Sequence, residues 1–133
     1  MLKKIGFLGL GTVGKHMAAN LLKGHYSLAV YDSDPQVVAE LVQLGASAAA
    51  TPKEVATGKD LVIVIRPEKV RLRPDLYGEN GIFAGISPGT ILADMGTHSL
   101  ESTLEMAAEA ENTGSCFSMR RSGGRRNTPP TVC

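Results

Sequence analysis

Residues 4–23 read KIGFLGLGTVGKHMAANLLK, and this stretch decides the fold. It opens on a short apolar run, Lys4 to Leu8, of the kind that forms a parallel strand covered on both faces. Three glycines follow, and Thr12 to Lys23 then carries apolar residues at helical spacing. The stretch therefore predicts a strand, a tight glycine turn and a helix, which together make the first half of a βαβ unit.

The three glycines, Gly9, Gly11 and Gly14, have the G-x-G-x-x-G spacing, and each has a mechanical role. The first permits the tight turn out of the strand, the second lets the backbone approach a pyrophosphate, and the third lets the helix pack closely on the strand. The N-terminus of the helix then offers unpaired N–H groups and a partial positive charge to phosphates. The turn therefore favours a dinucleotide as partner.

Asp32 follows a second predicted strand, Ser27 to Tyr31, and lies 18 residues past Gly14. An acid about 20 residues beyond the glycine turn binds the adenosine ribose in dinucleotide-binding folds. Its carboxylate accepts hydrogen bonds from both ribose hydroxyls and repels a 2′-phosphate, and no arginine follows at position 33 or 34 to neutralise one. We therefore expect NAD, with NADP left open. The alternative is a glycine-rich turn with Asp32 as an exposed turn residue.

The rest of the chain alternates between helix and strand patterns. Asp34 and Pro35 begin a helix that Gly45 ends. The residues predicted to face inward on this helix are Val38, Leu41 and Val42. The further elements are predicted to be a short strand over 46–50, a small helix from Pro52 to near Gly58, strands over 60–65 and 90–93, and a helix over 99–112.

The last of these helices is predicted to bury Leu100, Leu104, Ala107 and Ala108. Strands that alternate with helices indicate an α/β protein with right-handed crossovers. The sequence therefore predicts a Rossmann-type doubly wound parallel sheet.

Residues 7–21 resemble the signature of the β-hydroxyacid dehydrogenases, with Val13 where that family usually has methionine. The family includes 3-hydroxyisobutyrate dehydrogenase, tartronate semialdehyde reductase and, more distantly, 6-phosphogluconate dehydrogenase. The likeness continues over 44–55, 62–67, 77–82 and 94–97 and covers about residues 1–117. Within it, Arg66 and Gly96 replace a family leucine and serine.

The resemblance implies an NAD(P)-dependent oxidoreductase that moves hydride between a small β-hydroxy acid and nicotinamide. It implies no catalytic residue within the 133 residues, because the family's lysine belongs to a helical domain that follows the matched part. The residues that would bind the cofactor are Gly9, Leu10, Gly11, Thr12, Val13, Gly14, Asp32, Arg66, Pro67 and Thr97.

The segment 118–133 departs from the family and is expected to be an irregular basic tail behind a dinucleotide-binding domain over 1–117. Plausible GC-rich codons for the family's continuation, read one nucleotide late, give Ser118 to Ser122, so we expect a frameshift here. The helical domain would then be absent and the truncated chain inactive. The sheet would be incomplete at its C-terminal end, which leaves an exposed edge for self-association.

Composition limits the partners and the location that we expect for this protein. The segment 118–133 holds four arginines and no acid, so the other residues carry ten basic and thirteen acidic side chains. No apolar stretch approaches the ~20 residues that span a membrane, the first residues do not form a secretory signal, and Cys116 and Cys133 make no framework or metal pattern. We therefore expect a cytoplasmic protein with no membrane partner and no metal.

Two other functions stay open at this point. One is a non-catalytic module that senses NAD or regulates through it, which the length and the glycine turn allow. The other is a nucleic-acid binder that uses the arginine-rich tail. No interleaved aromatic residues or recognised module accompany those arginines. We therefore expect no nucleic-acid partner.

Overall fold

The computed structural model describes residues 4–9, 12–32, 34–65, 76–94, 100–119 and 131–132, with side chains except at 12, 13, 94, 100–103, 117–119, 131 and 132. The elements in chain order are β1 (Lys4–Leu8), α1 (Thr12–Lys23), β2 (Ser27–Tyr31), α2 (Pro35–Gln43), β3 (Ser47–Ala48), α3 (Pro52–Ala56), β4 (Leu61–Val64), α5 (Ile82–Gly85), β5 (Ile91–Asp94), α6 (Leu100–Thr113), β6 (Cys116–Met119) and β7 (Thr131–Val132).

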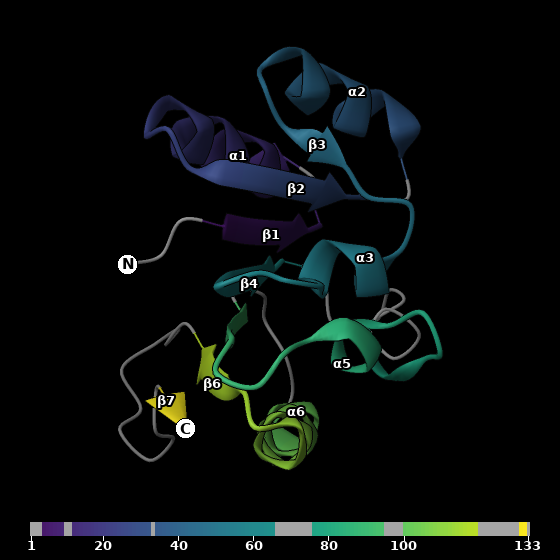
Figure 1. Ribbon diagram of the computed structural model, residues 1–133, viewed down its shortest axis with the longest axis vertical. Helices are drawn as coiled ribbons and strands as arrows, with labels where there is room; N and C mark the ends of the chain where they lie inside the picture. The colour runs from purple at the N-terminus through teal and green to yellow at the C-terminus, as the bar shows by residue number, and fades with distance from the viewer. Residues whose placement is uncertain are drawn as a thin grey trace.

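The strands form one sheet in the order β3-β2-β1-β4-β5-β6-β7. Strands β1 to β6 are parallel, and β7 pairs antiparallel with β6. The chain runs outward from β1 to β3 and then returns to place β4 on the other side of β1 (Figure 1). This 3-2-1-4-5-6 order confirms the predicted doubly wound sheet, and its reversal between β1 and β4 is where such folds bind ligands.

Two hydrophobic clusters lie on the two faces of the sheet, with α1 and α2 against one and α3, α5 and α6 against the other (Figure 1). Along β4, Val62 and Val64 belong to the second cluster and Ile63 to the first. Successive side chains of a strand point to opposite faces. Strand β4 is apolar at successive positions because helices cover both faces of the sheet.

The buried face of α2 differs in one residue from the prediction. Leu41 is fully buried, and Val37 and Val38 pack partly buried against the same cluster. Val42, which we expected inside, is 41% exposed. Helix α2 packs against β2, β3 and α1, and Val42 lies outside these contacts.

The buried face of α6 is not the predicted one. Met106 and Ala110 are fully buried, whereas Leu104 is 57% exposed and Ala108 is exposed. Of the predicted residues whose side chains are described, only Ala107 packs against the core. The helix carries two apolar stripes, one through Leu104 and Ala108 and one through Met106 and Ala110. Their sequence spacing is the same, so only contact with the sheet decides between them.

Some residues beyond 117, which we expected to be irregular, form strands. Strand β6 continues to Met119, whose partner in β5 is Asp94, and β7 pairs with Phe117 and Ser118. The expected exposed edge is therefore partly covered by β7. Cys116, the first residue of β6, forms a disulfide bond, which the spacing of the two cysteines did not indicate.

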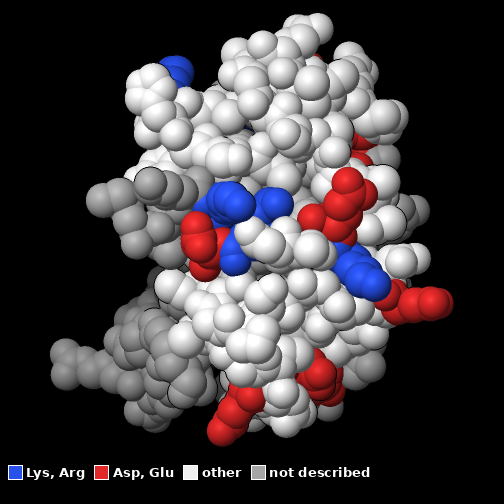
Figure 2. All heavy atoms as spheres, in the orientation of Figure 1, with Lys and Arg blue, Asp and Glu red and all other residues white. Residues whose placement is uncertain are grey.

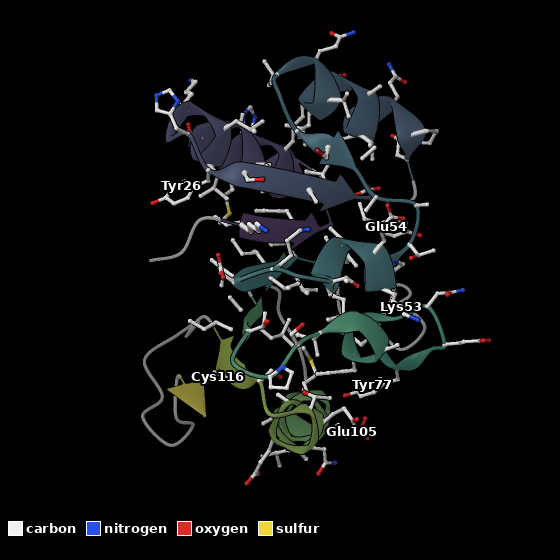
Figure 3. The ribbon with its side chains drawn as sticks, in the orientation of Figure 1. Tyr26, Lys53, Glu54, Tyr77, Glu105 and Cys116 are labelled. Atoms are coloured by element: carbon white, nitrogen blue, oxygen red, sulfur yellow. The ribbon has the colours of Figure 1, made fainter. Side chains whose placement is uncertain are left out.

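Helices α2 and α3 begin on side-chain caps. Asp34 Oδ1 accepts the backbone N–H of Gln36 at 3.0 Å, and Pro35 stands at the first helical position, as predicted. At α3, Thr51 Oγ1 accepts the N–H of Glu54 at 3.1 Å, and Glu54, labelled in Figure 3, accepts the N–H of Ala50 at 3.0 Å. Both caps satisfy donors that a helix N-terminus otherwise leaves open.

Helix α1 ends in a left-handed turn that does not use its glycine. Gly24 follows the helix, but the left-handed position is taken by His25, with φ of 65°. The N–H of His25 donates to Leu22 O at 3.1 Å and that of Tyr26 to Leu21 O at 3.4 Å, as in a Schellman cap. A side chain with a Cβ is strained in this conformation, where glycine is not.

We expect His25→Gly to stabilise the domain by about 0.5–1 kcal/mol, because it removes left-handed strain at some cost in unfolded-state entropy. A rise in the urea midpoint with an unchanged slope checks this. Gly24→Ala is the control at the adjacent position: a Cβ there would lie 3.1 Å from the exposed Tyr26 ring, which can move aside, so this change should not reproduce the rise. A midpoint for His25→Gly at or below that of the parent would contradict the expectation.

Candidate cofactor-binding site

The carboxyl ends of the central strands meet at one edge of the sheet. Leu8, the last residue of β1, is in register with Tyr31 of β2 and with Val64 of β4. The N–H of Gly9 donates to Tyr31 O at 3.1 Å, and that of Ile65 donates to Leu8 O at 2.9 Å. Gly9, Asp32 and Ile65 are therefore neighbours at the point where the strand order reverses (Figure 1).

The glycine turn is shaped by two close approaches. Gly9 has φ of 93°, a left-handed conformation that glycine adopts without strain. A Cβ on Gly14 would lie 2.2 Å from Gly9 O and 3.2 Å from Phe7 Cε1, so the first turn of α1 packs directly on the turn. The roles predicted for Gly9 and Gly14 are confirmed by this geometry. The N-terminus of α1, which carries a partial positive charge, thus starts directly beside Gly9.

Asp32 is half-buried immediately beyond β2. One of its carboxylate oxygens, Oδ1, accepts the backbone N–H of Asp34 at 2.9 Å. The carboxylate is thus held in a defined orientation beside the glycine turn. The sequence predicts a ribose-binding acid at Asp32 and a helix cap at Asp34, but the hydrogen bond that joins them was not predicted. The Asp-x-Asp-Pro pattern is the signal that would have indicated it, because aspartates accept from the N–H two residues on.

The predicted site residues fall into two groups. Gly9, Gly14 and Asp32 are brought together, and the backbone of Thr12 and Val13 forms the first turn of α1. The others lie outside the described residues: Leu10, Gly11, Arg66, Pro67 and Thr97. In the sequence, Arg66 and Pro67 follow directly on the chain leaving β4, and Thr97 comes three residues after the end of β5.

A separate pocket of about 320 Å³ lies at the opposite, amino-terminal edge of β4 and β5. Its lining is formed by Gly58, Lys59, Asp60, Ser87, Pro88, Gly89 and Thr90. The polar groups there bond to the protein itself: Thr90 Oγ1 donates to Lys59 O at 2.8 Å, and Lys59 Nζ donates to Thr57 O at 3.2 Å. This pocket therefore belongs to the connections between elements and is distinct from the cofactor edge.

Charges of both signs are interspersed on the face shown in Figure 2. Within the described ranges, no three histidine, cysteine or acidic side chains gather as metal ligands. The same part of the chain contains no helix with the length and apolar character that a bilayer crossing requires.

Comparison with known proteins matches residues 4–128 to the family model of the NAD-binding domain of 6-phosphogluconate dehydrogenase. Mouse mitochondrial 3-hydroxyisobutyrate dehydrogenase is 36% identical over 113 residues, which are 85% of this chain and 34% of that protein. The 3-sulfolactaldehyde reductase of Escherichia coli K12 is 38% identical over 116 residues, 86% of this chain and 38% of the reductase.

Among solved structures, 3-hydroxyisobutyrate dehydrogenase of Salmonella typhimurium superimposes with a TM-score of 0.79 at 28% identity, covering 92% of this chain and 43% of that one. The chain thus spans about a third of the length of the curated relatives it matches. The family match also extends beyond residue 117, to which the resemblance in the sequence was expected to be limited. With a Rossmann sheet, a glycine turn on α1 and an acid at the end of β2, this chain belongs to the family of the NAD-binding domain of 6-phosphogluconate dehydrogenase.

Proposed function

We propose that the chain is the cofactor-binding domain of an oxidoreductase similar to 3-hydroxyisobutyrate dehydrogenase, with NAD preferred over NADP. The observation that carries this is the position of Asp32, whose half-buried carboxylate stands next to the Gly9 turn. A carboxylate there favours two ribose hydroxyls and opposes a 2′-phosphate by like-charge repulsion. The names of the relatives support hydride transfer to or from a small β-hydroxy acid or the related aldehyde.

In this proposal the glycine turn and Asp32 bind different parts of the dinucleotide. The N-terminus of α1 and the backbone of the glycine turn bind the pyrophosphate, and Asp32 binds the adenosine ribose. The nicotinamide, when bound, exchanges hydride with the substrate. Arg66, Pro67 and Thr97 would flank its ribose and ring, since they follow β4 and β5 at the same edge. The general acid or base for the substrate oxygen would come from outside these 133 residues.

Asp32→Ala is expected to weaken NAD binding about 10- to 100-fold. The removed hydrogen bonds involve an ionised acceptor, and such bonds contribute about 1.5–3 kcal/mol. Affinity for NADP should fall less or rise, because the repulsion of the 2′-phosphate is removed with the carboxylate. Titration calorimetry with both cofactors measures the two dissociation constants.

Asp60→Ala is the matched control for this experiment. Asp60 is also a half-buried aspartate that accepts a backbone N–H, that of Lys4 at 3.0 Å, but it lies at the amino-terminal edge. It should leave both affinities unchanged. A parent chain that binds neither dinucleotide would refute the proposed function, and equal losses for NAD and NADP in Asp32→Ala would refute the preference.

The 133-residue chain alone is expected to bind NAD without turning over. The loss of a positioned general acid or base lowers the rate about 10²- to 10⁴-fold, and the loss of substrate positioning lowers it further. The check is NADH absorbance with 3-hydroxyisobutyrate as substrate and the purified chain at high concentration. NADH formation above the rate without protein would show that these residues contain the complete catalytic set.

A further inference from the structure

We propose that Asp34 is a positioning residue for the cofactor, which acts by fixing the carboxylate of Asp32. The inference rests on the proposed function and deepens it. Asp34 would make no contact with the dinucleotide. Its backbone N–H holds one oxygen of Asp32, and its side chain fixes the start of α2, which keeps that N–H in place.

The geometry forms one continuous chain of hydrogen bonds. The N–H of Asp34 donates to Asp32 Oδ1 at 2.9 Å. Oδ1 of Asp34 in turn accepts the N–H of Gln36 at 3.0 Å, and Asp34 O accepts the N–H of Val38 at 3.4 Å. With φ of −94° and ψ of 107°, Asp34 has the extended conformation of an N-cap, and Pro35 restrains the next residue. Asp34 is therefore hydrogen-bonded to the first turn of α2 through both its side chain and its carbonyl oxygen.

A carboxylate held in this way is prepared for its ligand before binding. With Oδ1 held by the N–H of Asp34, this oxygen of the carboxylate has a fixed position before the ribose arrives. Without the N-cap, the first turn of α2 frays and the donor no longer has a fixed position. Asp32 then has one fixed contact fewer before binding, and the additional ordering corresponds to about a 2- to 10-fold loss of affinity.

The charge of Asp34 is separable from its capping role. Asparagine also accepts from the backbone at an N-cap, so Asp34→Asn keeps the hydrogen bonds and removes the negative charge. Asp34→Ala removes the cap and keeps only the backbone donor. Thr51→Ala removes the corresponding cap of α3, which accepts the N–H of Glu54 at 3.1 Å. It thus controls for a general loss of helix stability at a helix that does not bear the Asp32 contact.

The test is a double-mutant cycle on the dissociation constant of NAD, measured by calorimetry on the full chain. In the parent background, Asp34→Ala should weaken NAD binding about 2- to 10-fold. The dissociation constant of Asp34→Asn should stay within about 2-fold of the parent value, and that of Thr51→Ala should be unchanged. In the Asp32→Ala background, Asp34→Ala should have no further effect, because the carboxylate it positions is gone.

The outcomes separate the inference from the proposed function. If the parent chain does not bind NAD, the proposed function fails first. If it binds, the inference is overturned by an unchanged affinity in Asp34→Ala, by a loss of the same size in the Asp32→Ala background, or by an equal loss in Thr51→Ala. Should Asp34→Ala not fold, Asp34→Gly takes its place, because glycine is tolerated at an N-cap yet provides no side-chain acceptor.

Discussion

Replacing Gly14 by alanine is expected to lower NAD affinity at least about 100-fold. A Cβ at this position would lie 2.2 Å from the carbonyl oxygen of Gly9, a backbone atom that cannot rotate away. Helix α1 must therefore move off the turn, and its N–H groups lose the pyrophosphate position. Two or more charge-assisted hydrogen bonds at about 1.5–3 kcal/mol each account for a loss of this size.

Calorimetry measures this affinity, and circular dichroism at the same temperature establishes that the variant is folded. Gly58→Ala is the control, because a Cβ on Gly58 meets nothing within 4 Å and its positive φ, of 69°, makes it a purely conformational substitution. It should cost about 1 kcal/mol in stability and leave NAD affinity unchanged. A folded Gly14→Ala variant that binds NAD as tightly as the parent would contradict the close-packed turn.

Replacing Gly6 by alanine is expected to destabilise the fold by about 3 kcal/mol or more. Gly6 lies in the middle of β1, and a Cβ there would be 2.1 Å from Val55 O and 3.1 Å from Val55 C. Helix α3 passes directly over this glycine, with Val55 and Ala56 fully buried. The backbone of α3 must shift away from the sheet, and the core on that face opens.

Urea unfolding followed by circular dichroism measures the loss. Gly45→Ala is the matched control, since Gly45 has φ of 116° and open space around it, so only the conformational strain of about 1 kcal/mol applies. If Gly6→Ala lowered the free energy of unfolding by no more than Gly45→Ala, the close approach of α3 to β1 would not hold in solution.

Local signals predicted the first half of the chain well. The bounds of β1, α1 and β2 agree with the structure, and so do the cap at Asp34 and the stop at Gly45, where φ is 116°. Each of these depends on residues within a few positions of one another. A side-chain cap and a left-handed glycine stabilise a helix end through local bonds and backbone angles. A continuous apolar run likewise indicates a strand that is covered on both faces.

Other features depended on partners distant in the sequence. The inward face of α6 was predicted wrongly because Leu104 and Met106 belong to stripes of equal spacing, and only the position of the sheet selects Met106. Strand β3 is two residues long instead of the five predicted, because its register with β2 covers only Ala29 and Val30. The pairing of β7 with β6 and the disulfide of Cys116 likewise required the folded chain.

The sequence by itself determined the glycine turn, the acid at the end of β2 and the order of helices and strands, because turns, caps and periodicity are local. The tertiary structure decided that Gly9, Gly14 and Asp32 meet at one edge, that Gly6 must lie under Val55, and that the backbone of Asp34 holds the carboxylate of Asp32. These depend on strand register and on close approaches between backbones. Register and approach are properties of the packed sheet and its helices together, which no single segment encodes.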